Sequence, residues 1–152
     1  MGEIQLPPHW KLVNLGHICQ KKPQNGAFIK KPEWGEGTLF VNVRDTYKSV
    51  VVNLRQVERL QASFDEVKRY SIEEGDLLFV RSSLKREGIG QCCVIEELIE
   101  PAIFDCHIIK ISPIKEIAHS LYLAFYFLSE SARNDLIARS KTTTMTTINQ
   151  QG

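Results

Sequence analysis

The residues best suited to bind a ligand form one short polar segment between two apolar runs. Two arginines, a lysine, two serines and two glycines stand there: Arg81, Ser82, Ser83, Lys85, Arg86, Gly88 and Gly90. Arginine binds a phosphate or a guanine edge through two parallel hydrogen bonds, while hydroxyls and glycine amides reach phosphate oxygens. The segment therefore suits a polyanion such as DNA, and a solvated hairpin without a ligand is the alternative.

Two enzyme classes lack their motifs. An adenine methyltransferase needs a polar residue before a proline pair, but Leu6 precedes Pro7 and Pro8. The sequence Gly88-Ile89-Gly90 has no third glycine and no acidic partner downstream, so it predicts no cofactor loop. Serine hydrolysis is not favoured either, because Ser82 and Ser83 are not part of a Gly-x-Ser-x-Gly turn.

A divalent-metal nuclease is the main alternative among enzymes. Such a site needs carboxylates that hold the metal and a lysine beside them, and Asp45, Glu66 and Lys68 match that pattern loosely. Glu66 and Lys68 would diverge on a helix, which is the structure that their surroundings predict. A solvated helix face is therefore the favoured interpretation of these residues.

The cysteines and histidines predict no metal site and no cofactor. The four cysteines show no C-x-x-C spacing, and the four histidines are scattered along the chain. Adjacent Cys92 and Cys93 should face opposite sides of a strand. The sequence Asp105-Cys106-His107 resembles a ligand set, but in a strand Cys106 would point away from both neighbours. We therefore expect Cys106 to be a buried structural thiol.

Composition predicts one globular domain that is soluble and cytoplasmic. Of the 152 residues, 43% are hydrophobic and 24% charged, and the start of the chain lacks a signal-peptide pattern. The net charge is only +1, but residues 1–60 hold nine lysines and arginines against five acidic residues. Because DNA affinity depends on a local basic patch, the small net charge does not exclude DNA binding.

The first half of the chain predicts strands and loops. We expect short strands at residues 11–14, 39–45 and 49–54, a helical turn at 15–20 and an irregular exposed loop over 21–37. A helix over 61–70 should follow, with hydrophobic side chains at helical spacing.

The second half changes from strands to helices. Residues 77–80, 91–96 and 102–111 predict strands, 114–128 and 129–139 predict helices, and the threonine-rich tail 141–152 favours extended structure. Strands followed by helices predict an α+β domain with a mainly antiparallel twisted sheet and C-terminal helices packed on it.

The order of several landmarks resembles the specificity-subunit family of type I restriction-modification systems. Residues 6–10 and Leu15-Gly16 resemble the family's opening, although His9 stands where glycine is usual. Residues 75–90 resemble its central strand and loop, and 122–129 its late helix. The segment 143–149 resembles the part that closes the domain, although Lys141-Thr142 stand where a glycine often precedes the threonines.

This resemblance implies a role in DNA recognition without catalysis. Residues 1–140 would form a target-recognition domain for one half of a split DNA target, and 141–152 a closing segment that leads towards a spacer helix absent from this chain. Modification subunits, and through them restriction subunits, would be the partners that bind the methyl donor and flip the base. We therefore expect one recognition half, present as a fragment or a truncated product.

The family motifs do not specify which residues contact bases, so the candidate contacts follow from their chemistry. The primary candidates are Arg81, Ser82, Ser83, Lys85 and Arg86. The secondary candidates are Arg44, Lys48, Thr143 and Thr144. A protein-interaction or RNA-binding module is the remaining alternative, since Trp34 and Phe28 could stack on bases. Trp34 as a packing anchor for its own loop is the favoured interpretation.

Overall fold

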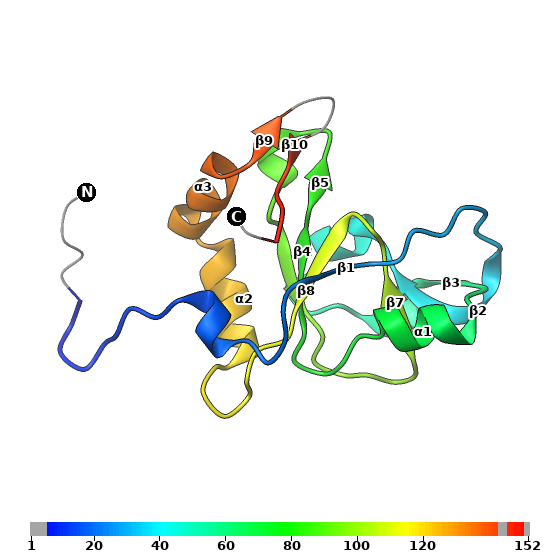
Figure 1. Cartoon of the computed structure of the whole chain (residues 1–152), viewed down its shortest axis with the longest axis horizontal. Helices are drawn as coiled ribbons and strands as arrows, with labels where there is room; N and C mark the ends of the chain where they lie inside the picture. The colour runs from blue at the N-terminus through cyan, green and yellow to red at the C-terminus, as the bar shows by residue number, and fades with distance from the viewer. Residues whose placement is uncertain (1–5, 143–145, 151–152) are drawn as a thin grey trace.

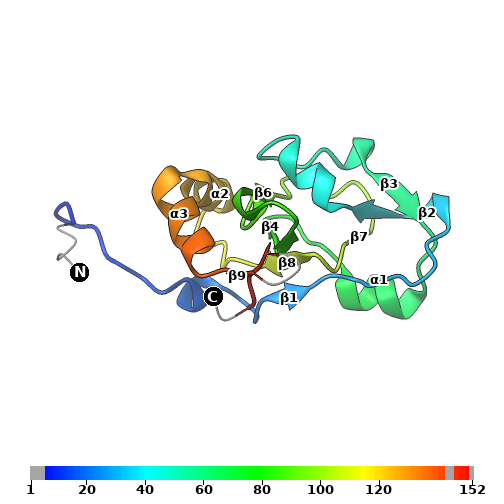
Figure 2. The same ribbon diagram turned by 90° about the horizontal axis from the view of Figure 1, so that it is seen from above.

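A four-stranded antiparallel sheet is the centre of the computed structural model, which describes residues 6–142 and 146–150. Its strands run in the order β1 (Gln24–Asn25), β8 (Ile108–Ile111), β4 (Leu77–Val80) and β6 (Cys92–Val94). Every residue of β4, β6 and β8 is buried, so this sheet is covered on both faces. Figure 2 shows the sheet between two helices on one side and a second sheet on the other.

The second sheet contains β3 (Glu58–Leu60), β2 (Trp34–Val41) and β7 (Ala102–Phe104), with β2 and β7 parallel. Helix α1 (Phe64–Tyr70) covers one side of it in Figure 1, and its first turn is fixed by the reciprocal capping of Ser63 and Glu66. The third sheet is small, and it joins β5 (Ser82–Ser83), β10 (Thr146–Thr147) and β9 (Lys141–Thr142).

Two consecutive helices cover the other face of the central sheet. They are α2 (Ser120–Leu128) and α3 (Glu130–Ala138), and Ser129 ends the first and caps the second. Short 3-10 helices connect the strands: η1 (Leu15–Ile18), η2 (Val43–Tyr47), η3 (Leu54–Gln56) and η4 (Arg86–Gly88). No helix among the described residues is long and apolar enough to cross a membrane.

The pleat of the central sheet divides the hydrophobic core in two. Leu78 and Cys93 face the β2 and β7 side, where they pack with Phe104. Phe79 and Cys92 face α2, and they pack in a cluster with Leu123, Ala124 and Ile148. The expected opposite orientation of Cys92 and Cys93 is thus confirmed. Together the three sheets and the C-terminal helices confirm the α+β class with mainly antiparallel pairing.

Several expected boundaries were wrong. Residues 11–14 form no strand, and residues 43–47 turn into η2 instead of extending a strand. Part of the expected loop 21–37 forms β1 and the start of β2, while only an isolated bridge at Val51 represents the expected strand 49–54. The first C-terminal helix begins at Ser120, because residues 115–117 form a turn.

The largest error concerns residues 102–111, which were expected to form one strand. They form β7 and β8 in two different sheets, joined by a turn at Asp105–His107. Asp105 and His107 interrupt the apolar pattern at the turn, but single polar residues also occur within strands, and neither glycine nor proline marks the break.

A buried polar cluster joins β4 to β8 at the end where β4 begins. Asp76 accepts hydrogen bonds from the hydroxyl of Ser112 at 2.6 Å and from the backbone N–H of Glu73 at 2.8 Å. The Nζ atom of Lys110 lies 3.6 Å from its carboxylate and donates to the carbonyl of Ser71 at 2.5 Å. The side chains of Lys110 and Asp76 are only 9% and 3% exposed. Burial outweighs these contacts and raises the pKa of Asp76.

Replacing Lys110 with methionine should leave the Asp76 carboxylate without its cation. We expect the free energy of unfolding to fall by about 3 kcal/mol at pH 7, because a buried charge then lacks its partner. The loss should shrink as the pH falls towards 5. A carboxyl group whose pKa is raised in the folded state favours folding when it is protonated, and that contribution is lost as the pH rises through the folded pKa. Urea unfolding at both pH values measures the change.

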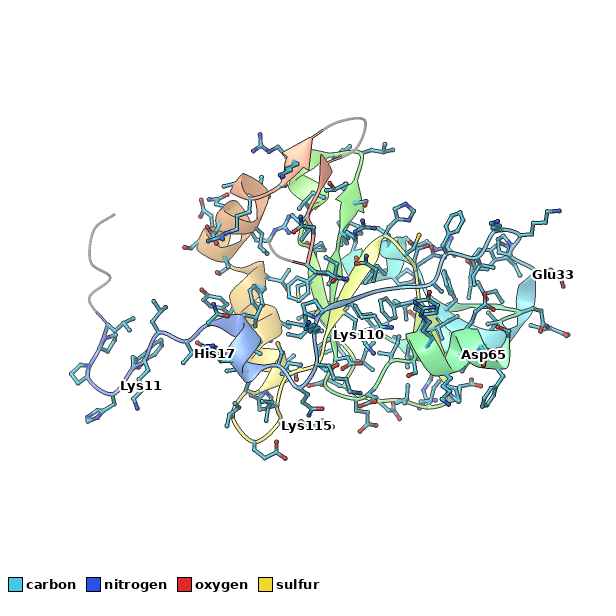
Figure 3. The ribbon with its side chains drawn as sticks, in the orientation of Figure 1. Lys11, His17, Glu33, Asp65, Lys110 and Lys115 are labelled. Carbon is cyan, nitrogen blue, oxygen red and sulfur yellow. The ribbon has the colours of Figure 1, made fainter. Side chains whose placement is uncertain are left out.

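Lys115→Met is the matched control, since this lysine lies in the exposed loop before α2 (Figure 3), and it should change stability by less than about 0.5 kcal/mol. A loss in Lys110→Met that stays constant between pH 7 and 5 would contradict the role assigned to Asp76.

Candidate nucleic-acid interface

The polar segment 81–90 forms one wall of an open groove with a volume of about 600 Å³. Side chains from η2 and from the turn between β7 and β8 complete the groove. The residues that line it are Val43, Tyr47, Ser82, Ser83, Leu84, Lys85, Glu87, Gly88 and His107. Three segments far apart in the sequence therefore meet at this surface.

The base of the segment is firmly held by the sheets. The backbone N–H of Arg81 donates to the carbonyl of His107 at 2.7 Å, and its own carbonyl accepts from Ile148 at 3.0 Å. The guanidinium of Arg81 is partly buried and donates to the carbonyl of Cys106 at 3.3 Å. Ser82 is buried, and Ser83 pairs with Thr146 of β10. Arg81 and Ser82 thus fix the start of the segment to the sheets.

The tip of the segment projects into solvent. Leu84, Lys85 and Arg86 are all exposed, and Leu84 is 85% exposed. The backbone N–H of Lys85 donates to the hydroxyl of Ser83 at 3.2 Å, which closes a tight turn around Leu84. Within the described part of the chain, neither Lys85 nor Arg86 lies within ion-pair distance of a carboxylate. Both cations are therefore available to an anionic ligand.

The second half of the segment, residues 87–89, is held by side chains from two other elements. Arg133 of α3 donates to the carbonyls of Glu87 and Ile89, and the hydroxyl of Tyr47 donates to the carbonyl of Gly88 at 3.1 Å. Three successive carbonyls are thereby held by side chains from two other elements. Partial burial lowers the pKa of the Arg133 guanidinium. The clamp gives the tip a rigid base.

Gly90 ends the segment in close contact with α3. Its φ angle is +69°, and a Cβ atom there would lie 2.9 Å from Cδ1 of Leu136. Glycine is the residue that adopts this backbone conformation at least cost, and here it also lets the loop approach the helix.

The predicted contacts Arg44, in η2, and Lys48, directly after it, are exposed but already paired. Arg44 forms an ion pair with Glu58, which raises the pKa of the guanidinium. Lys48 forms one with Asp45 at 2.7 Å. The Arg44–Glu58 pair is exposed on both sides, so exchange of Glu58 for a phosphate would cost little. Asp45 is only 4% exposed, so Lys48 could turn to a phosphate only by leaving a buried carboxylate without its cation. Thr143 and Thr144 lie outside the described residues.

The turn Asp105–His107 contradicts the expectation that Cys106 points away from its neighbours. The ligand atoms of these three residues lie within 4.8 Å of one another, and Cys106 is only partly buried. One oxygen of Asp105 lies 2.8 Å from Nδ1 of His107 and accepts the backbone N–H of His107 at 2.7 Å. Burial raises the pKa of Cys106. The cluster thus stabilises the turn that places His107 in the groove wall.

The residues of the nuclease alternative have structural roles. Asp45 is 4% exposed and accepts the backbone N–H of Asn42 at 2.9 Å. Glu66 caps α1, where hydrogen bonds from Ser63 lower its pKa. Among the described residues, neither carboxylate belongs to a group of three convergent ligands. The structure therefore offers no support for metal-dependent cleavage at these positions.

Trp34 is 48% exposed at the start of β2, so its interpretation as a packing anchor for its own loop stays a prediction. Its ring meets that of Phe40 edge-on, with 5.7 Å between the centroids. Phe28 remains exposed, but no ring contact pairs it with Trp34 among the described residues.

Sequence reasoning missed several residues of this surface, among them Leu84, Tyr47, His107 and the supporting residue Arg133. Leu84 is apolar and was passed over in favour of its basic neighbours. Tyr47 and Arg133 lie 41 and 44 residues from the carbonyls of Gly88 and Ile89 that they bind. No local pattern links residues at such separations, so only the folded chain identifies them.

Comparisons with known proteins agree on one family. The sequence model of the family described as Type I restriction modification DNA specificity domain matches residues 7–151. The EcoKI specificity subunit, from the type I restriction enzyme of Escherichia coli strain K12, is 28% identical over 140 residues; the match covers 90% of this chain and 30% of that subunit.

A solved chain from work on complex assembly and conformational transition of the type I R-M system shares the fold, with a TM-score of 0.64 and 16% sequence identity. That match covers 98% of this chain and 33% of the solved chain, so this chain spans about a third of the length of both relatives. Because the family match extends over nearly the whole sequence, the chain belongs to the type I restriction modification DNA specificity domain family.

Proposed function

We propose that this chain recognises one half of a split, double-stranded DNA target as part of the specificity component of a type I restriction-modification system. The observation that carries the proposal is the family match over residues 7–151. Residues 1–140 would be the target-recognition domain, and 141–152 would lead on towards a spacer helix. Modification subunits and, through them, restriction subunits would be the protein partners in the cytoplasm.

The segment 81–90 is the proposed DNA-contacting element. No carboxylate in the described part of the chain pairs with its exposed cations at Lys85 and Arg86, and its backbone is held by Arg133 and Tyr47. A fixed backbone favours base recognition, because a bidentate contact with a base edge tolerates less displacement than a phosphate contact. Ser82 and Ser83 stay predicted contacts of the first group, and Arg44, Lys48, Thr143 and Thr144 stay predicted secondary contacts.

Arg81 and Arg86 should differ in their effect on base preference. Arg86 is exposed at the tip, so Arg86→Ala should cost about 1–3 kcal/mol on the target and relax one base position. Arg81 supports the base of the segment through the carbonyl of Cys106, so Arg81→Ala should also lower thermal stability. Selection from randomised sites with the complete methyltransferase assembly, together with melting curves, separates the two effects. Unchanged base preference in both variants would assign base recognition to the surfaces around Arg44 and Thr143.

Binding should depend on salt in proportion to the number of phosphate contacts. If Lys85 contacts a phosphate, Lys85→Ala should reduce the slope of log affinity against log salt by about 0.9 and weaken all sequences equally. Fluorescence anisotropy with target and unrelated duplexes at several salt concentrations measures both quantities. Lys115→Ala is the control, because Lys115 lies in the loop before α2, away from the segment (Figure 3). An unchanged slope in Lys85→Ala would remove this residue from the phosphate contacts.

The Arg133 clamp should control specificity without contacting DNA. In Arg133→Lys a point charge replaces the planar fork, so the carbonyls of Glu87 and Ile89 cannot both be bound in the same way. We expect a stability loss of about 1.5–3 kcal/mol and a reduced ratio of target to non-target affinity, with the salt slope unchanged. Arg139→Lys, directly after the same helix, is the matched control, since its ion pair with Asp135 is exposed. A lower salt slope in Arg133→Lys would mean that the residue binds phosphate directly.

We also propose that the chain itself is not catalytic. Purified protein should neither cleave plasmid DNA with Mg²⁺ nor bind the methyl donor in calorimetry. Glu66→Ala should then affect only the stability of α1, through loss of its capping box. Cleavage that Glu66→Ala abolishes would establish the nuclease alternative instead.

A further inference from the structure

The tip of the segment 81–90 presents an apolar side chain in a basic setting. Leu84 has the highest exposure, 85%, among the large hydrophobic residues of the described chain. Single exposed leucines are common on protein surfaces, so exposure by itself indicates little. The local structure distinguishes this one, because the residues on both sides of it are fixed.

Both flanks of Leu84 are anchored. Ser83 pairs with β10, and its hydroxyl accepts the backbone N–H of Lys85 at 3.2 Å. The carbonyl of Lys85 accepts the N–H of Gly88 at 3.0 Å, and Gly88 is in turn held by Tyr47. The leucine is therefore held outward by a turn that cannot fold it back without breaking these bonds.

The chemistry of DNA narrows what such a side chain can contact. Phosphate and sugar oxygens form hydrogen bonds with the serine hydroxyl and the lysine ammonium, but they form none with an isobutyl group. In the major groove the apolar group that a base edge offers is the C5 methyl of thymine, which only A·T pairs carry. A leucine between a hydroxyl and an ammonium group thus matches an edge that contains a thymine methyl beside polar atoms.

We propose that Leu84 contacts the C5 methyl group of a thymine in the target, and so determines specificity at that base pair. This inference rests on the proposed function. It adds an apolar contact to the polar contacts expected of the neighbouring residues, and it assigns the tip of the segment to the major groove.

The test removes the methyl group from the DNA and the side chain from the protein separately. The protein is the complete methyltransferase assembly whose specificity subunit carries this domain, and the duplexes replace each target thymine with deoxyuridine in turn. For the wild type, one replacement should weaken binding about fourfold, the value of one buried methyl group. For Leu84→Ala, binding to the unmodified target should be weaker, and the same replacement should have no further effect.

The control variant is Ile117→Ala, since Ile117 is also aliphatic and exposed but lies in the loop before α2. It should keep the full response to deoxyuridine. Melting curves should show that both variants fold like the wild type.

Other outcomes separate the failure of this inference from that of the proposed function. Sequence-specific binding in which Leu84→Ala retains the wild-type response to every deoxyuridine would overturn the role of Leu84 alone. Weaker binding by Leu84→Ala with no deoxyuridine response in the wild type would instead indicate a wedge between base pairs, and would also overturn it. Absence of any sequence-specific binding by the assembly would overturn the proposed function itself.

Discussion

Strand β4 is constrained on every side, and the remainder of the structure is arranged around it. Its two edges pair with β6 and β8, and its two faces are buried in separate hydrophobic clusters. A shift of one residue would move Leu78 into the cluster of Phe79 and reverse every side chain of the strand. The register is therefore strongly specified, and so is the point at which the chain leaves the strand at Arg81.

Strand β4 fixes where the proposed DNA-contacting segment begins, and contacts with β10, η2 and α3 fix its shape. Its base is paired with β10, and its second half is bound by Arg133 and Tyr47. Hydrogen bonds to carbonyls do not depend on the side chains of the segment. The tip residues can thus differ without loss of the clamp, an arrangement well suited to a surface whose base contacts determine the target.

The distribution of paired and unpaired cations explains why net charge says little about this protein. Arg44, Arg55 and Arg59 each form an ion pair with a glutamate, and Lys110 is buried beside Asp76. Lys85 and Arg86, by contrast, project from the tip without such a pair in the described chain. A net charge of +1 is therefore compatible with a locally cationic surface.

Local patterns in the sequence determined the parts of the fold that depend on near neighbours. The buried strand 77–80, the capped helix after Ser63 and the opposed cysteines of β6 were predictable, because strand and helix periods act over a few residues. The order of motifs also identified the family, and the basic segment was recognised as the candidate site.

Tertiary structure decided what depends on residues far apart. The turn at Asp105–His107 divides residues 102–111 between two sheets, because Ala102–Phe104 pairs with β2 and Ile108–Ile111 pairs with β4. Likewise, only the packing of α3 against the segment 81–90 places Arg133 on two of its carbonyls and leaves Leu84 at the tip. Hydrogen bonds from side chains to distant backbone groups follow no periodic pattern in the sequence, so they can be identified only in the folded chain.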